Sequence, residues 1–180
     1  GIGTPLHVLI TQREHLRYSS SIKMHLWSRE LPLDSFFENE LDITLSTPLF
    51  TLLTMAPHIS CVHLAMVMYE LCGSFTVFRP TPEVQAHLDA SKTTNLPKDA
   101  WRQVRNAQGD GTSLWKRPAL ISLHELQRYA ERIDGLRGSK QFRRALQMVS
   151  GSAASPLEAQ ASILLGAPRR LGGAGLSPFE

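Results

Sequence analysis

The sequence predicts an α+β fold, in which a small β-containing N-terminal unit is built around a helix pair and three C-terminal helices follow. Residues 1–45 contain short runs with the character of half-buried strands. Residues 47–72 and 122–180 instead repeat apolar residues at helical spacing. We therefore expect an N-terminal unit at residues 1–121, with an irregular connector at residues 79–121, and a helical C-terminal part after it.

Three N-terminal segments are expected to form strands. Leu6–Ile10 is a brief apolar run, and Ser21–Ser28 alternates apolar with polar residues. Phe36–Leu45 is expected to hold one more strand, with Ile43 and Leu45 on the same face.

Two helices are predicted at the centre of the N-terminal unit. Thr47 can cap a helix whose first position is Pro48, where no N–H group is required. Ser60 opens the second helix and Gly73 ends it, before a short strand at Phe75–Phe78. The residues expected to face the core are Leu49, Leu52, Leu53, Ala56, Leu64, Ala65, Met68, Tyr69 and Leu71.

Turn-forming residues interrupt the connector. Gly109-Asp110-Gly111 and several prolines, Pro97 among them, break regular structure. Only short helical turns are expected there, at Pro82–Leu88 and Ala100–Ala107. The tryptophans at positions 101 and 115 are expected to anchor this stretch to the core.

Serines open the three C-terminal helices. Ser122 and Glu125 have the spacing of a capping box, in which each side chain bonds the backbone N–H of the other residue. Ser155 and Glu158 repeat this spacing before the last helix, and Ser139 opens the middle one. The expected core residues are Leu126, Ala130, Ile133, Phe142, Ala145, Leu146 and Val149.

The composition excludes several protein classes. A chain of 180 residues that is 42% hydrophobic can bury a core without a disulfide or a metal. Its 2 cysteines are too few for the disulfide framework of a small secreted protein. No apolar run is long enough to span a bilayer, and the N-terminus lacks the pattern of a secretion signal. We expect a cytoplasmic protein.

No arrangement of residues indicates a complete active site. The sequence contains no G-x-S-x-G motif and no serine or cysteine in an activating context. One histidine–cysteine cluster could bind zinc, but the second pair of closely spaced ligands typical of structural zinc sites is missing. We interpret that cluster as core or surface residues. A group of carboxylates at strand-like spacing could bind a cation together, but we interpret it as a solvated strand face. We expect no metal site. The residues concerned are His58, Cys61, His63 and Cys72 in the first group, and Glu38, Glu40 and Asp42 in the second.

Charge is distributed unevenly along the chain. The net charge is +3, with a balance of −4 over residues 1–90 and +7 over residues 91–180. A compact basic cluster surrounds the start of the middle C-terminal helix. Guanidinium groups bind phosphate bidentately, and a helix N-terminus adds donors of the same sign. Phe142, the aromatic residue within this stretch, is expected in the core, so no aromatic is interleaved on the exposed face and the cluster predicts contact with a phosphate backbone; a merely solvated face is the alternative. The cluster consists of Arg137, Lys140, Arg143 and Arg144, with Arg128 and Arg132 on the preceding helix.

Two segments resemble a known family. Leu41–Gly73 (LDITLSTPLFTLLTMAPHISCVHLAMVMYELCG) and Leu123–Leu165 are similar to successive blocks of the AbiEi-type antitoxin proteins and their actinobacterial relatives. In many members the last helix opens an endonuclease domain similar to very-short-patch-repair endonucleases, of the PD-(D/E)xK kind. Glu158 matches the first carboxylate of that site, and the Asp and Glu-x-Lys that complete it have no match up to Glu180.

The resemblance implies a non-catalytic regulatory or DNA-associated module of a toxin–antitoxin or phage-defence protein, without a cofactor. Its expected partner is DNA, bound through the basic C-terminal helices, while a pure protein-binding module would dock a cognate toxin on the acidic N-terminal half. The alternative is a fragment of a metal-dependent endonuclease. In that case Glu158 would be catalytic with Mg²⁺ or Mn²⁺, and the remaining catalytic core would lie beyond residue 180.

Overall fold

Helices and small sheets are mixed throughout the computed structural model, which describes residues 5–91 and 101–176. Six α-helices and three small sheets lie in the described residues, so the predicted α+β class is confirmed. The chain divides into unit 1, residues 1–33 and 80–94, and unit 2, residues 34–79 and 95–180. This division differs from the two parts expected from the sequence. The expected turn at Pro97 lies outside the described residues.

Unit 1 contains a two-stranded sheet and a helix. Strands β1 (Leu6–Ile10) and β2 (Ile22–Leu26) pair in parallel and correspond to the first two predicted strands. The 3₁₀ helix η1 (Arg13–His15) lies in their connection. Helix α3 (Pro82–Ser91) is longer than the predicted helical turn or two. Thr81 caps the start of α3, because its hydroxyl accepts the backbone N–H of Val84 at 3.5 Å.

Unit 2 begins with a β-hairpin where the sequence predicted one strand. Strands β3 (Phe36–Glu38) and β4 (Thr44–Ser46) pair antiparallel. The Asn39 side chain accepts the N–H groups of Leu41 and Ile43, at 3.0 and 2.9 Å. These two bonds hold a turn in the middle of the segment, so the prediction of a single strand was wrong.

The helix pair forms the centre of unit 2. Helix α1 (Pro48–Met55) is capped by Thr47 and helix α2 (Cys61–Cys72) by Ser60, as predicted. Helix α2 packs against α1, α5, α6 and strand β5, and Leu64, Ala65, Met68 and Tyr69 are buried on it. Gly73 ends α2, but its φ is −89°, so it is not the left-handed residue of the usual glycine stop. Glycine fits there because a Cβ would collide with the Ala153 carbonyl.

A three-stranded antiparallel sheet follows the helix pair. Its strands β5 (Phe75–Val77), β6 (Arg102–Arg105) and β7 (Gly111–Lys116) have the order β5-β7-β6. The helical turn predicted at Ala100–Ala107 was therefore wrong, because pairing with β7 makes its central residues a strand. Trp115 is an anchor as predicted, buried with its indole N–H donating to the Phe78 carbonyl at 3.0 Å. Trp101 is 46% exposed, and its prediction as an anchor was wrong.

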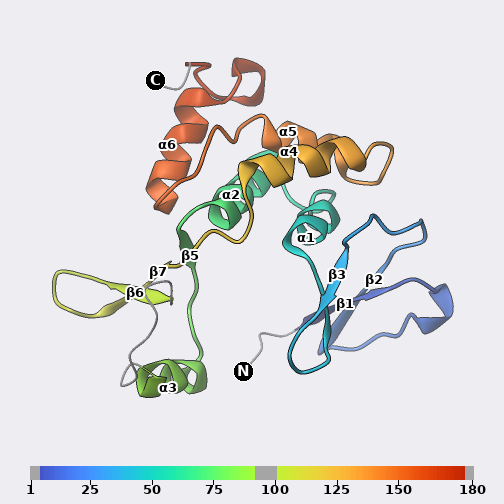
Figure 1. Cartoon of the computed structure of the whole chain (residues 1–180), viewed down its shortest axis with the longest axis horizontal. Helices are drawn as coiled ribbons and strands as arrows, with labels where there is room; N and C mark the ends of the chain where they lie inside the picture. Colours follow the sequence, from blue (N-terminus) through green and yellow to red (C-terminus); the bar gives the residue numbers. More distant parts are fainter. Residues whose placement is uncertain (1–4, 92–100, 177–180) are drawn as a thin grey trace. The chain divides into compact units, whose positions relative to one another are not determined.

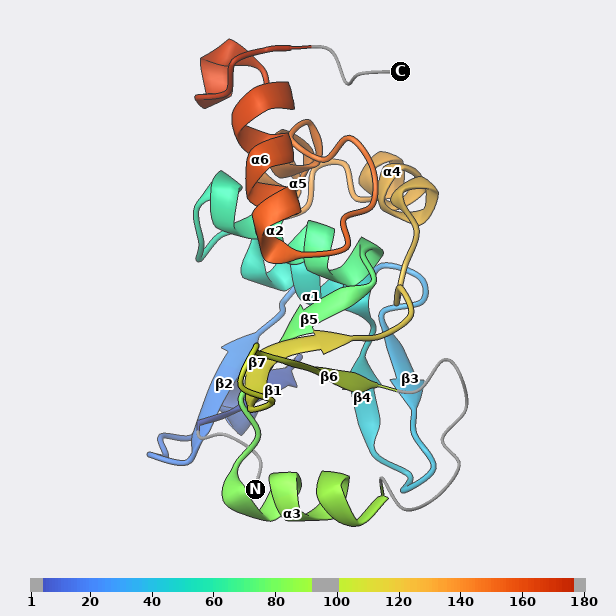
Figure 2. The same ribbon diagram turned by 90° about the vertical axis from the view of Figure 1, so that its left-hand side faces the viewer.

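The three predicted C-terminal helices are α4 (Leu123–Arg132), α5 (Ser139–Leu146) and α6 (Pro156–Gly166), and the 3₁₀ helix η2 (Arg169–Leu171) follows them. The capping box of Ser122 and Glu125 is present. Helix α5 begins at Ser139 as predicted, with Gly138 as its N-cap, and Ser139 is buried. Within unit 2, Figures 1 and 2 show α4, α5 and α6 on one side of α2 and the β5-β7-β6 sheet on the other. None of the described helices has the length and apolar character needed to cross a membrane.

Candidate nucleic-acid interface

The turn between α4 and α5 is fixed against the end of α1. Gly138 has a φ of +93°, which is a conformation that favours glycine. A Cβ on Gly138 would lie 2.7 Å from the Leu53 carbonyl oxygen and 3.1 Å from Pro57 Cδ. The backbone therefore approaches α1 more closely than a side chain permits. Glycine at this position sets where α5 begins.

Arg143 joins α5 to the end of α4. Its Nε and Nη2 donate to the Ala130 carbonyl at 3.1 and 3.0 Å, and its Nη1 donates to the Asp134 carboxylate at 2.7 Å. A basic side chain is favourable there, because the last carbonyls of α4 have no partner within the helix. The hydrogen bond and charge of Arg143 lower the pKa of Asp134 below its usual value. Arg143 therefore holds the α4–α5 turn in place.

The other three cations of the predicted cluster differ from Arg143, because their charges are left to the solvent. Arg137, Lys140 and Arg144 are exposed, and none of them makes a hydrogen bond or ion pair within residues 5–91 and 101–176. Together with Ala56 and Pro57 they line a cavity of about 660 Å³ at the α4–α5 turn. Helix α5 begins here without a side-chain cap, so the N–H groups of its first turn add partial positive charge. We call Arg137, Lys140 and Arg144 the turn cluster.

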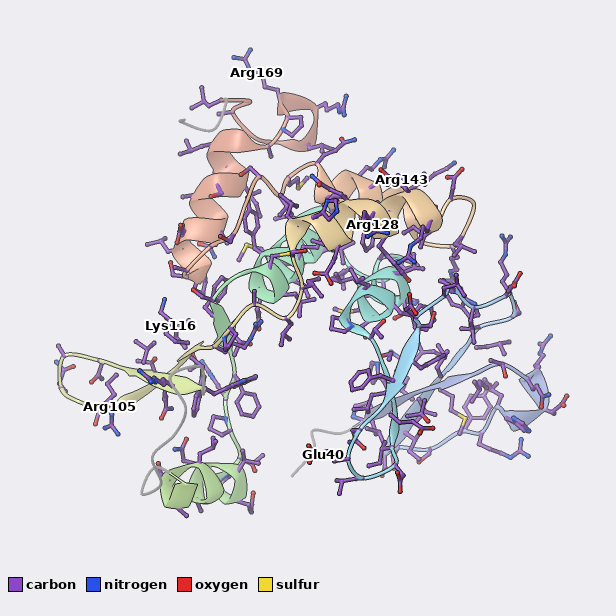
Figure 3. The ribbon with its side chains drawn as sticks, in the orientation of Figure 1. Glu40, Arg105, Lys116, Arg128, Arg143 and Arg169 are labelled. Carbon is purple, nitrogen blue, oxygen red and sulfur yellow. The ribbon has the colours of Figure 1, made fainter. Side chains whose placement is uncertain are left out.

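More cations of unit 2 lie on α4 and after α6. Arg132 lies over the Tyr129 ring at 5.8 Å and within 3.7 Å of the Asp34 carboxylate. Both members of this ion pair are well exposed, so it leaves most of the Arg132 charge to solvent. Figure 3 labels three arginines of unit 2: Arg128 on α4, Arg143 on α5 and Arg169 after α6.

The histidine–cysteine cluster does not converge. His63 lies in the first turn of α2, and Cys72 is the last residue of the same helix. Cys72 follows His63 by nine positions, which at about 1.5 Å per residue correspond to about 14 Å, too far for ligands of one ion. Burial raises the pKa of the Cys72 thiol to about 11, which disfavours the thiolate that binds metals. No group of three histidine, cysteine, aspartate or glutamate side chains converges in the described part of the chain.

Glu158 lies in the N-terminal turn of α6. Its carboxylate accepts the backbone N–H of Ala154 at 2.8 Å, while the Ser155 hydroxyl accepts the N–H of Glu158 at 3.3 Å. The predicted capping-box role is therefore shifted by one residue, since the carboxylate bonds Ala154 instead of Ser155. The carboxylates of the second group, Glu38, Glu40 and Asp42, lie on the β3–β4 hairpin and its turn.

Sequence reasoning found the cations of the turn cluster but not the cavity that they line. Ala56 and Pro57 contribute to its wall from the end of α1, about 80 residues earlier in the chain. The sequence signal for the close approach of this turn to α1 is Gly138, where a side chain would collide with Leu53 and Pro57. Comparison with known proteins adds no relative, because no family model, curated protein or solved structure matches this chain.

Proposed function

We propose that this chain is a non-catalytic module that associates with nucleic acid by contacting the phosphate backbone through the turn cluster. The observation that carries the proposal is the cavity lined by three exposed cations, none of which makes a hydrogen bond or ion pair within the residues that the structure describes. Because Arg143 holds the turn, these cations extend from a fixed backbone. A preorganised cluster loses less conformational entropy on binding than three cations on a free loop.

The spacing of the cations suits a phosphate backbone. Lys140 and Arg144 lie four residues apart, on one face of α5, and Arg137 precedes the helix. Guanidinium groups bind phosphate oxygens bidentately, and Lys140 adds a point charge. Contacts of this kind position a protein on a duplex but do not read its sequence. We therefore propose binding that depends strongly on salt and weakly on base sequence.

The resemblance to AbiEi-type antitoxins supports DNA as the polyanion and a regulatory role in toxin–antitoxin or phage-defence systems, within the cytoplasm. Only Glu158 corresponds to that family's nuclease site, and its carboxylate bonds the backbone of its own helix start. We therefore prefer the non-catalytic role to the endonuclease alternative.

A protein partner is a second candidate, because the β3–β4 hairpin exposes apolar side chains beside carboxylates. Phe37 is 47% and Ile43 50% exposed, and Glu38 and Asp42 lie next to them in the sequence. Apolar groups with an acidic rim suit a basic protein partner, such as a cognate toxin.

The experiment compares duplex binding by two variants that lose the same charge. Fluorescence anisotropy of a labelled duplex would be measured with the wild type, with Arg137/Lys140/Arg144→Gln, and with the control Arg13/Lys23/Arg79→Gln. The control residues are also exposed cations, and none of them lines the cavity. The proposal expects a large loss of affinity in the first variant only. Equal affinity of the two variants would show that general charge, and not the turn cluster, attracts the duplex.

A further inference from the structure

Two histidines of unit 1, His7 on β1 and His25 on β2, lie side by side on neighbouring parallel strands. Pairing places Lys23 opposite His7 and Leu9 opposite His25, so both imidazoles lie on the same face of the sheet. The ring centroids are 4.9 Å apart, and the ring planes are tilted by 34°. His7 Nδ1 lies 3.1 Å from His25 Nε2. One nitrogen of each ring therefore lies within hydrogen-bonding distance of the other.

This separation is suitable for two imidazole ligands of one metal ion. Two Zn–N bonds of about 2.0–2.1 Å at a tetrahedral angle place the nitrogens about 3.3 Å apart. The right angle of a square-planar Cu²⁺ or Ni²⁺ site places them about 2.8 Å apart. The observed 3.1 Å lies between these values. Without a metal, a hydrogen bond from one ring to the other holds the same two nitrogens together, so the pair is preorganised.

We propose that His7 and His25 form a two-histidine site for Zn²⁺ or another divalent cation that prefers imidazole ligands, with water in the remaining positions. His7 is exposed and His25 half-buried, so the pair is open to solvent on at least one side. This site was missed by the sequence interpretation, which expected no metal. The missed signal is a histidine at an alternate position of each of two strands that turn out to be neighbours.

The bound ion would join β1 to β2. A two-stranded sheet is only marginally stable in isolation, and a metal link between small elements adds stability in the folded state alone. We therefore expect Zn²⁺ to raise the unfolding midpoint of the wild-type chain.

Calorimetric titration of the full chain, without a histidine tag, tests the site. The wild type is expected to bind one equivalent of Zn²⁺ here, and His7→Gln and His25→Gln are each expected to weaken that binding at least about tenfold. His15→Gln is the matched control, an exposed unit 1 histidine on η1, and should bind like the wild type. Mg²⁺, which prefers oxygen ligands, should not compete.

Two further measurements do not depend on losing a ligand. Lys23→Glu replaces a cation opposite His7 by a carboxylate on the same face, and is expected to increase the affinity for Zn²⁺. In the NMR spectrum of the wild type, Zn²⁺ is expected to shift the ring resonances of His7 and His25 first. Absence of binding by the wild type, equal affinity of all three Gln variants, or first shifts at other histidines would each overturn the proposal.

Discussion

Replacement of Gly138 by alanine tests whether the α4–α5 turn is held against α1. Two costs add at this position. An alanine at the φ of +93° costs about 1–2 kcal/mol, because the left-handed region is unfavourable for residues with a Cβ. Its Cβ would also lie 2.7 Å from the Leu53 carbonyl, and relieving such overpacking typically costs about 1–3 kcal/mol more. We expect Gly138→Ala to lower the free energy of unfolding by about 2–5 kcal/mol.

Gly135→Ala is the matched control for the backbone cost. Gly135 also has a positive φ, +71°, but a Cβ there has no neighbour within 4 Å. Its expected loss is therefore about 1–2 kcal/mol. Both variants would be compared by urea denaturation followed by circular dichroism, with unchanged slopes as evidence for the same unfolding reaction. Equal losses in the two variants would contradict the close approach of Gly138 to α1.

Three further predictions concern single side chains. Arg143→Ala should destabilise the fold by about 1–3 kcal/mol in thermal unfolding, because the Ala130 carbonyl at the end of α4 loses its donors. Arg144→Ala should change the stability by no more than about 0.5 kcal/mol. Similar losses in the two variants would show that Arg143 does not hold the α4–α5 turn. The Tyr129 hydroxyl is the buried side-chain polar atom without a partner in the described residues, so Tyr129→Phe should stabilise the fold by about 1 kcal/mol. Burial raises the pKa of Tyr129 to about 12, so as the pH rises above about 10 this tyrosine ionises in the unfolded chain before it ionises in the folded one. The wild type then loses stability, and the stability difference between Tyr129→Phe and the wild type should grow with pH. A difference that stays constant above about pH 10 would contradict this. Iodoacetamide should modify Cys61 well before Cys72 at pH 8, because Cys72 is buried and its pKa is about 11. The modification rate of Cys72 should still be rising with pH above about 9. Equal rates for the two cysteines, measured by mass spectrometry, would refute this.

Local hydrogen bonds explain which parts of the fold could be predicted from the sequence. Thr47, Ser60 and Ser122 each cap a helix through a backbone N–H three residues away, so a short stretch of sequence contains both partners. Strand β6 is different, because it depends on its pairing with β7, and nothing between residues 102 and 105 indicates that pairing. Tertiary pairing of this kind overrides local propensity.

The same contrast applies to the candidate site. The spacing of Lys140 and Arg144 on one helix face follows directly from the helical period. The role of Arg143 does not, because the carbonyl that it bonds belongs to Ala130 on another helix. Helical periodicity alone gives Arg143 the same character as its neighbours, and only the packing of α4 on α5 separates them.

The salt dependence of duplex binding tests the central claim most directly. Each phosphate contact contributes a slope of about −0.9 to the logarithm of the association constant against the logarithm of salt concentration. Arg137/Lys140/Arg144→Gln should therefore flatten the wild-type slope by about 2–3 units, and Arg13/Lys23/Arg79→Gln should leave it unchanged. A wild-type slope in the turn-cluster variant would contradict the account, because Arg137, Lys140 and Arg144 would then make no phosphate contacts.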